Sequence, residues 1–430
     1  MGYIVITSKG EKIVLEDSPF SKGGEGEVRG IISAPSIYAN CCVKIYYTKK
    51  RTKEQANKIR FMVDNPPEKI ESNGFKIAWP RETIHHLNNE FIGFIMPLAF
   101  PGSEQLVYLT ATNLNIKKLG TIWQKYSRDN GKFALISRLK LMNNIAIPIY
   151  LLHQTGKYVL KDFKPQNVLV THFGQVTICD MDSIQITNGQ QLLFPATAAT
   201  KEYIPPEFYN LGIGKSTAVP LEKSWDYFAV SVVFYQLLFG LHPYMVTPKC
   251  QRNPDSLEIS ENISDDLFPF GGNNNQIANV PKLHDKFLVL PPKIQDLFRR
   301  AFSTIPSQRP SADEWGKNIH EIVKNAGDIQ APQQPVAQPK PTPIHIPEPP
   351  KPAPTVSKPQ ITTNVNTGED ENLGGEMWAA GILLPPIGFI AMFVYLIQGK
   401  EKKGLSAFFA SLIGAALYFF LTIIVISLGR

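Results

Sequence analysis

The feature that most constrains the fold of this chain is a cluster of polar residues between apolar segments in the middle of the sequence. Asp162, Lys164 and Asn167 follow one another closely, and the apolar run Val-Leu-Val comes directly after them. A second strand-like apolar run leads to Asp180. Together they place two carboxylates, an amide oxygen and a cation around one cleft. Magnesium-assisted phosphoryl transfer requires this set of groups.

A glycine-rich turn near the N-terminus gives a second, weaker signal. Gly23, Gly24 and Gly26 lie between two strand-like runs, shortly before Val28. Because glycine has no Cβ, backbone amides at such a turn can approach phosphates closely. Lys44 lies inside an apolar strand, where a buried ammonium needs a carboxylate or a phosphate as its partner. A glycine hairpin without a ligand, and a lysine that points outward from an edge strand, are the alternatives.

The order of the elements indicates the fold class. Short strand-like runs come first and longer helical patterns follow, which favours an α+β domain with two lobes. The expected strands are residues 12–15, 27–32, 41–47 and 91–96. The expected helices are residues 52–63, 133–153 and 225–239, the last buried on every side and the second kinked at Pro148.

With these motifs in this order and spacing, residues 10–325 resemble the protein kinases, particularly the bacterial eukaryotic-like serine/threonine kinases. The resemblance implies a protein-kinase fold over residues 1–328, with an N-terminal lobe to about residue 98 and a C-terminal lobe beyond it. It also implies ATP and Mg²⁺ as cofactors and a protein as substrate.

The resemblance assigns a role to each residue of the cleft. The glycine-rich turn would cover ATP, and Lys44 would hold its α- and β-phosphates. Asp162 matches the catalytic aspartate, which orients the substrate hydroxyl and accepts its proton, and Lys164 would steady the γ-phosphate. Asn167 and Asp180 match the two metal-binding positions.

Two further parts of the ATP site are expected from the resemblance. The helix after the lysine strand should supply a carboxylate for Lys44, and Glu54 is the only acid in its first three turns, although it lies earlier than usual. An exposed helix glutamate is the alternative. The connection between the lobes should lie near Met96 and Leu98, where adenine would hydrogen-bond to the backbone.

Residues further along the chain match structural positions of the same family. Thr200 would touch the catalytic aspartate and lysine, and Asp226 would anchor the backbone of the catalytic loop. Arg309 would form a buried ion pair with Glu207.

The sequence also departs from the family pattern. Ser21 replaces the first glycine of the loop, and Leu160 and Lys161 replace the histidine and arginine before the catalytic aspartate. Asp182 replaces the glycine two residues after the metal-binding aspartate. We hypothesise that Asp182 restricts the flipped, inactive arrangement of this segment or adds negative charge near the metal.

Composition divides the remaining quarter of the chain. Eleven of the 35 prolines fall between residues 332 and 359, which predicts an extended or disordered linker over residues 329–376. Two uncharged apolar runs follow at residues 377–397 and 404–428, each long enough to cross a bilayer core of about 30 Å. We expect two transmembrane helices and contact with membrane lipid. A buried helical pair is the alternative.

Two arguments about the orientation of this hairpin in the membrane disagree. Lys400, Lys402 and Lys403 in its loop would place the loop in the cytoplasm, which puts the kinase-like domain outside. The need for ATP and the absence of a secretory pattern at the N-terminus favour a cytoplasmic domain at the membrane. Pro385 and Pro386 offer a third arrangement, in which the first run enters the membrane and returns.

Charge and cysteine content exclude other classes. With 44 Lys and Arg against 37 Asp and Glu, the net charge of +7 gives no support for a nucleic-acid binder. Four cysteines without a CxxC pair argue against a disulfide scaffold or a zinc module. We therefore predict a membrane-tethered protein serine/threonine kinase. The alternatives are a pseudokinase that acts as an ATP-binding scaffold and a small-molecule kinase.

Overall fold

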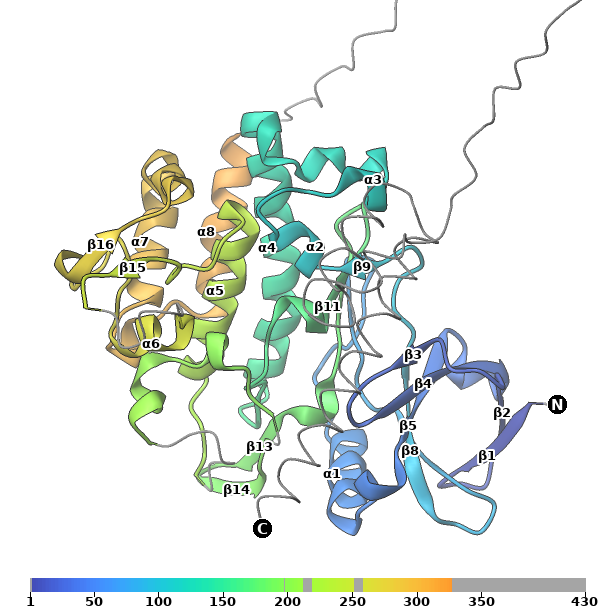
Figure 1. Cartoon of the computed structure of the whole chain (residues 1–430). Coiled ribbons are helices and arrows are strands. Elements are labelled where there is room, and N and C mark those ends of the chain that lie inside the picture. Colours follow the sequence, from blue (N-terminus) through green and yellow to red (C-terminus); the bar gives the residue numbers. More distant parts are fainter. Residues whose placement is uncertain (1, 197, 212–218, 251–257, 327–430) are drawn as a thin grey trace, which may run out of the picture. The chain divides into compact units, whose positions relative to one another are not determined.

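A computed structural model of the chain describes residues 2–196, 198–211, 219–250 and 258–326. The chain divides into two units, Met1–Gln338 and Pro339–Arg430, and every described residue lies in the first. The expected linker and the two expected membrane spans therefore lie outside the described residues. The first unit is an α+β domain with two lobes, a sheet-rich N-terminal lobe and a helical C-terminal lobe (Figure 1).

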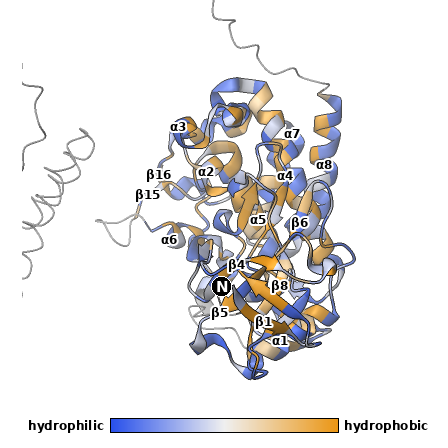
Figure 2. Cartoon of the chain, turned by 90° about the vertical axis from the view of Figure 1, so that its right-hand side faces the viewer, coloured by the Kyte–Doolittle hydropathy of each residue, from blue (hydrophilic) through white to orange (hydrophobic). Residues whose placement is uncertain are grey.

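The N-terminal lobe is built on one sheet of seven strands in the order β2-β1-β7-β8-β5-β4-β3. Because β2 also pairs with β4, the sheet curves back on itself. Buried residues of these strands form a separate apolar core, among them Val5, Val43 and Ile95. The strands of this sheet are largely coloured as hydrophobic in Figure 2. The strands are β1 (Tyr3–Thr7), β2 (Lys12–Leu15), β3 (Ser21–Lys22), β4 (Gly26–Ser33), β5 (Cys41–Tyr46), β7 (Glu82–His85) and β8 (Phe91–Pro97).

Helix α1 (Lys53–Asp64) follows β5 and packs against β7 and β8. It begins at Thr52, whose hydroxyl accepts a hydrogen bond from the Gln55 N–H at 3.1 Å, as expected of an N-cap threonine. At its other end, the Trp79 indole N–H donates to the carbonyl of Met62 at 2.9 Å. The helix is therefore held at both ends.

The C-terminal lobe is organised around helix α4 (Gly131–Gln154) and helix α5 (Ser224–Phe239), which share one continuous apolar core. Helix α8 (Ala312–Asn325) packs along α4, and α7 (Pro292–Ala301) packs against α5. The shorter helices are α2 (Val107–Thr110), α3 (Ile116–Leu119) and α6 (Ile259–Ser264).

Three small sheets complete the C-terminal lobe, and the first of them carries segments of the cleft. A four-stranded sheet contains β6 (Phe75–Ile77), β12 (Val176–Ile178), β11 (Val168–Val170) and β9 (Glu104–Gln105). A three-stranded sheet contains β10 (Tyr158–Val159), β13 (Gln185–Asn188) and β14 (Gln191–Phe194), and the third pairs β15 (Thr247–Pro248) with β16 (Ile277–Asn279). The pairing of β11 with β12 brings Asn167 and Asp180 to the same end of one hairpin.

The expected strands and helices are confirmed within one or two residues at each end. Helix α5 is almost wholly buried, as its apolar composition predicts. Helix α4 runs through Pro148. The apolar pattern in its sequence, Phe133, Ile136, Leu139, Ile147 and Leu151, predicts a long buried helix, but Ile147 is exposed. In the seven-stranded sheet, β1, β3 and β7 are not among the expected strands. Among the described residues, one helical stretch is long and apolar enough to span a membrane, Arg128–Gln154, and it is the core helix of this lobe.

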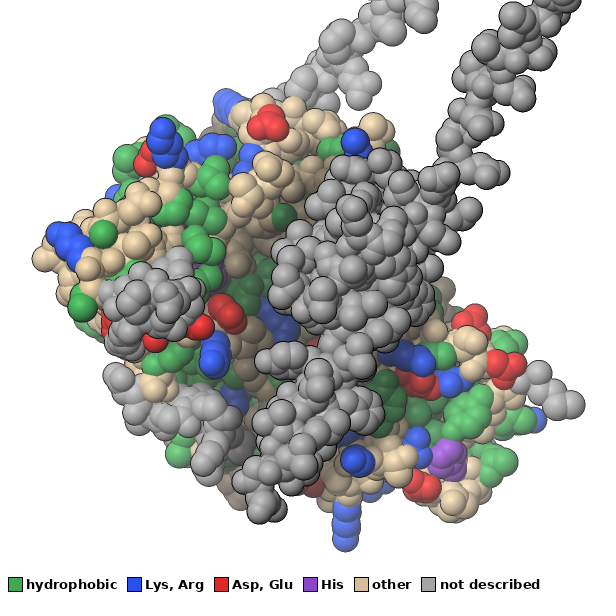
Figure 3. Space-filling view, in the orientation of Figure 1, with side chains coloured by type: hydrophobic (Ala, Val, Ile, Leu, Met, Phe, Trp, Pro, Cys, Tyr) green, Lys and Arg blue, Asp and Glu red, His purple; other side chains and the backbone are tan. Residues whose placement is uncertain are grey.

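On the face shown in Figure 3, basic and acidic side chains of the described residues are interspersed. This mixture agrees with the modest net charge of +7 for the whole chain.

Candidate active site

A cavity of about 510 Å³ lies between the curved sheet and the C-terminal lobe. Its volume falls in the range of small-molecule sites, about 300–1,000 Å³. The β3–β4 turn, β5, the end of β8 and the β11–β12 hairpin contribute to its wall. The predicted site residues that line it are Gly23, Gly24, Gly26, Val28, Lys44, Met96, Leu98, Asn167 and Asp180.

The glycines of the β3–β4 turn serve two different purposes. The Gly23 N–H donates to the carbonyl of Gly26 at 2.9 Å and closes the turn, and a Cβ at Gly24 would meet nothing within 4 Å. At Gly26 a Cβ would lie 2.2 Å from the carbonyl oxygen of Ile45. Gly26 is therefore required for the pairing of β4 with β5, whereas Gly24 leaves open space over the cavity.

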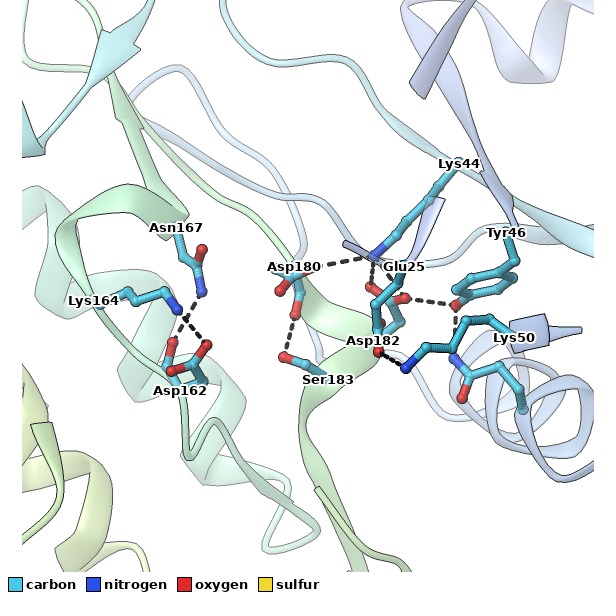
Figure 4. A network of polar contacts seen from close by, with 11 residues as sticks. Glu25, Lys44, Tyr46, Lys50, Asp162, Lys164, Asn167, Asp180, Asp182 and Ser183 are labelled. Atoms are coloured by element: carbon cyan, nitrogen blue, oxygen red, sulfur yellow. Dashed lines mark hydrogen bonds and ion pairs between the residues drawn. The ribbon is translucent and has the colours of Figure 1, made fainter. Parts of the chain in front are cut away.

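Lys44 points from β5 into the cleft and is held by two carboxylates (Figure 4). Its Nζ lies 3.0 Å from Asp180 Oδ1 and 2.7 and 2.8 Å from the two oxygens of Asp182. Burial alone would lower the pKa of Lys44, but Asp182 and then Asp180 raise it above its ordinary value. The alternative of a lysine pointing away from an edge strand is excluded, because β5 lies inside the sheet, between β4 and β8.

Asp162 lies at the centre of a second group of contacts. The Thr200 hydroxyl donates to Asp162 Oδ1 at 2.6 Å, and Lys164 Nζ lies 2.7 Å from Asp162 Oδ2. Lys164 also donates to the Thr200 hydroxyl at 2.9 Å. The expected contact of Thr200 with both residues is confirmed.

Asn167 lies beside Asp162 and Lys164, and Asp180 lies between this group and the contacts of Lys44 (Figure 4). Asn167 donates its Nδ2 to the backbone carbonyl of Asp162 at 2.9 Å, which leaves its Oδ1 for a ligand. Asp180 has a left-handed backbone with φ of 61°, and its carbonyl accepts from the Ser183 hydroxyl at 2.8 Å. Its side chain is 38% exposed, so the carboxylate faces the cavity.

These oxygen donors fit a magnesium ion. No cluster of three His, Cys, Asp or Glu occurs among the residues described here. Mg²⁺ in phosphoryl-transfer sites does not require such a cluster, because it binds through one or two carboxylates, water and the substrate phosphates.

A comparison with known families then decides what kind of domain this is. Residues 81–320 match the family model described as the protein kinase domain. The chain belongs to the protein kinase family. The matched segment contains Asp162, Lys164, Asn167 and Asp180 but starts after Lys44, so the assignment of the glycine turn and this lysine rests on the geometry of the kinase cleft.

Curated relatives of the kinase are serine/threonine kinases. Serine/threonine protein kinase ypkA of Aspergillus fumigatus is 24% identical over 234 residues, which cover 54% of this chain and 31% of that protein. Serine/threonine-protein kinase YPK1 of Saccharomyces cerevisiae is 28% identical over 155 residues, or 35% and 21% of the two chains. Mouse serine/threonine-protein kinase 16 is 30% identical over 139 residues, or 30% and 44%. The kinase thus spans less than half the length of each of these relatives.

The expectation that Glu54 pairs with Lys44 is corrected by the structure. Glu54 lies in the first turn of α1 and is exposed, which is the alternative raised from the sequence, and the partners of Lys44 are Asp182 and Asp180. The inward position one turn later is taken by a cation. Lys58 is 3% exposed, and its Nζ has no hydrogen-bond partner among the described residues.

Sequence reasoning missed the residues that surround Asp182. The Tyr46 hydroxyl donates to Asp182 Oδ2 at 2.6 Å, and Gln55 Nε2 donates to the Tyr46 oxygen at 2.7 Å. Burial of Asp182 opposes its ionisation, but Lys44 and the Tyr46 hydrogen bond hold its pKa below the ordinary value. Two features of the sequence could have pointed to this pairing. Position 182 is an acid, and the apolar face of α1 carries a lysine, Lys58, but no acid.

Asp226 of α5 fixes the backbone of the loop that precedes Asp162. Its carboxylate accepts the N–H groups of Leu160 at 2.7 Å and Lys161 at 2.9 Å, which confirms the expected anchoring role. Lys161 has a left-handed backbone with φ of 60°. His153 of α4 completes the group, with Nε2 2.8 Å from Asp226. A histidine from another element therefore contacts Asp226, while Leu160 packs in the apolar core.

The other predicted elements are also placed. The guanidinium of Arg309 binds both oxygens of Glu207 at 2.7 and 2.6 Å, as expected. Met96 and Leu98 line the cavity, but the Leu98 N–H donates to the carbonyl of Asn40 at 2.8 Å. An adenine ring in this kinase would have to use another main-chain group of the connection.

Proposed function

We propose that this chain is a protein serine/threonine kinase that transfers the γ-phosphate of ATP to protein hydroxyl groups and depends on Mg²⁺. The observation that carries the proposal is the contact group of Asp162, Lys164 and Thr200 beside a cavity lined by Lys44 and Asp180. A hydroxyl-orienting carboxylate and a phosphate-binding lysine in one cleft are the parts that phosphoryl transfer needs.

Asp162 would orient the attacking hydroxyl and accept its proton. Its two oxygens are held in different directions by Thr200 and Lys164, so the carboxylate has one defined orientation. Lys164 lies next to the Asp162 carboxylate and would attract the γ-phosphate of ATP towards the substrate hydroxyl. Both residues act by positioning and by charge, which supply most of the catalysis in this reaction class.

Lys44 and the β3–β4 turn would hold the triphosphate on the other side of the cavity. Asn167 Oδ1 and the Asp180 carboxylate are the oxygen donors that would hold Mg²⁺, which supplies charge neutralisation on the β- and γ-phosphates. The removal of Asp162 should therefore abolish phosphate transfer without preventing ATP binding.

A phosphate-transfer assay, combined with a measurement of ATP binding, tests this proposal. Purified full-length protein is incubated with labelled ATP and Mg²⁺, and phosphate on protein serine or threonine is measured for wild type, Asp162→Ala and the exposed-site control Asp64→Ala. We expect transfer by wild type and the control only, with ATP binding retained in all three. Phosphate transfer by Asp162→Ala would refute the assigned role.

The same assay separates the two rival functions. A pseudokinase would give no transfer by wild type, and Asp180→Ala would then change nothing. A small-molecule kinase would consume ATP only when a metabolite mixture replaces protein substrates. The ordered contacts of Thr200, Glu207 and Arg309 favour a protein substrate, because the family resemblance implies that small-molecule kinases of this fold generally lack the segment 200–207.

We further propose that a proline-rich linker at residues 329–376 tethers the kinase to a membrane through two spans, 377–397 and 404–428. This part of the proposal rests on the composition of the sequence. We place the kinase domain on the cytoplasmic side, where ATP is supplied. A Glu401→Cys variant labelled in intact cells by an impermeant reagent tests a full hairpin, and absence of labelling beside a labelled external control would exclude it.

A further inference from the structure

We infer that Asp182 is the positioning residue of Lys44, and that no charged group of helix α1 takes part in holding this lysine. The inference rests on the proposed function, because it explains how the same cleft would hold the phosphates of ATP. The carboxylate that positions Lys44 would then come from the short segment after Asp180 and not from helix α1.

The contacts of Lys44 distinguish its two carboxylate partners. Asp182 offers both oxygens, at 2.7 and 2.8 Å, and its side chain is 1% exposed. Asp180 offers one oxygen at 3.0 Å, and its side chain is 38% exposed to the cavity. Asp182 is therefore dedicated to the lysine, whereas Asp180 stays available to a ligand.

A second set of contacts fixes Asp182 itself. Tyr46 lies on the same strand as Lys44, two residues later, and its hydroxyl donates to Asp182 Oδ2 at 2.6 Å. Two side chains of strand β5 therefore bind Asp182, the ammonium of Lys44 and the phenol hydroxyl of Tyr46. Gln55 of α1 reaches this group only through the Tyr46 oxygen, at 2.7 Å, and contributes no charge.

Helix α1 offers no acid to replace Asp182. Glu54 is exposed, and the inward position carries Lys58, which is 3% exposed. Lys58 lies near enough to both Lys44 and Asp182 for the charges to interact, so it repels the first and attracts the second. The cluster therefore contains two lysines around one buried carboxylate, and removal of that carboxylate leaves Lys44 without its main anchor.

The test is a double-mutant cycle on ATP affinity, measured by calorimetry with the full-length protein. The four proteins are wild type, Asp182→Asn, Lys44→Met and the double variant. We expect Asp182→Asn to weaken ATP binding about tenfold, and about twofold or less when Lys44 is already methionine, because coupled residues are not additive. Glu54→Gln is the matched control and should leave the affinity unchanged. In the phosphate-transfer assay, Asp182→Asn should raise KM for ATP and leave KM for the protein substrate unchanged.

A second version of the double-mutant cycle keeps the net charge of the buried cluster unchanged when Asp182 is replaced. If Asp182→Asn does not fold, all four proteins are remade with Lys58→Met, which removes a buried cation together with the anion. The same pattern of coupling is expected.

Several outcomes would overturn the inference. Unchanged or tighter ATP binding in Asp182→Asn, an equal loss in the Lys44→Met background, or a comparable loss in Glu54→Gln would each do so. Failure of the proposed function is distinguishable. A wild type that binds ATP but transfers no phosphate refutes the function and leaves the cycle readable, whereas a wild type that binds no ATP refutes both.

Discussion

Replacement of Lys58 by methionine should stabilise the domain at neutral pH. The Lys58 side chain is 3% exposed, and its Nζ has no hydrogen-bond partner among the described residues. Burial lowers its pKa from 10.5 to about 8, although Asp182, Glu25 and Glu54 act in the opposite direction and Lys44 adds to the lowering. Methionine keeps most of the length and packing of the side chain and removes the charge.

The size of the effect follows from the two pKa values. At pH 7 Lys58 is charged in both states, and a difference of about 2.5 pKa units corresponds to about 3 kcal/mol that the buried charge costs the folded state. Between pH 8 and pH 10.5 the unfolded chain binds more protons at this residue, so the penalty falls as pH rises. At pH 9.5 the advantage of Lys58→Met should have shrunk to about 1.4 kcal/mol.

The assay is thermal unfolding of both proteins at pH 7 and pH 9.5, with Lys53→Met as the control. Lys53 lies on the same helix and is exposed, so its replacement should change stability by less than about 0.5 kcal/mol. We expect Lys58→Met to raise Tm by roughly 5 °C at pH 7, given about 0.7 kcal/mol/K of unfolding entropy for a domain of this size. Equal Tm values at pH 7, or a difference that does not shrink with pH, would refute the reasoning.

Three further predictions concern the framework of the site, and unfolding in urea or by heat checks each of them. Asp226→Ala should lower the free energy of unfolding by about 3 kcal/mol, because two buried N–H groups lose their acceptor; a loss below about 1 kcal/mol would contradict the anchoring role. Gly93→Ala should cost more than about 2 kcal/mol, since its Cβ would lie 1.9 Å from a backbone oxygen of β5, whereas Gly24→Ala, with open space around it, should be nearly neutral. Arg309→Lys should cost about 2 kcal/mol, because an ammonium cannot bind both oxygens of Glu207 as the guanidinium does; a stability equal to wild type would show that charge alone suffices.

Much of the fold could be predicted because its signals are local. Helix α1 is buried on one side and has a periodic apolar pattern, whereas α5 is buried on all sides and is apolar throughout. Both patterns can be read within a single element, and both helices form as expected. Ile147 shows the limit of this reasoning, because a helix packed on several sides has no single apolar stripe and the pattern does not identify its exposed positions. Strands of two to four residues, such as β9 and β10, depend on partners far away in the sequence and carry no period of their own.

The candidate site divides in the same way. The segment from Asp162 to Asp180 is short, so its spacing alone brings the groups together on one hairpin. The partner of Lys44 is 138 residues away at Asp182, and the choice between it and Glu54 depends on which face of α1 turns inward. A helix with one acid at each end, Glu54 and Asp64, and two lysines does not reveal that face, and only the packing of Ile59 and Met62 does.

The pairing of Lys44 with Asp182 has a consequence for the evolution of this group of kinases. The fully buried carboxylate beside Lys44 can be supplied either by the helix or by the loop. Two acids there would repel each other, and none would leave Lys44 with only the partly exposed Asp180 as its acidic partner. Residues 58 and 182 should therefore vary together among close homologues: a cation or neutral residue at 58 where 182 is acidic, and an acid at 58 where 182 is glycine. An intermediate ancestor would have passed through one of the two unfavourable combinations, so the exchange should be rare and should mark a branch of the family.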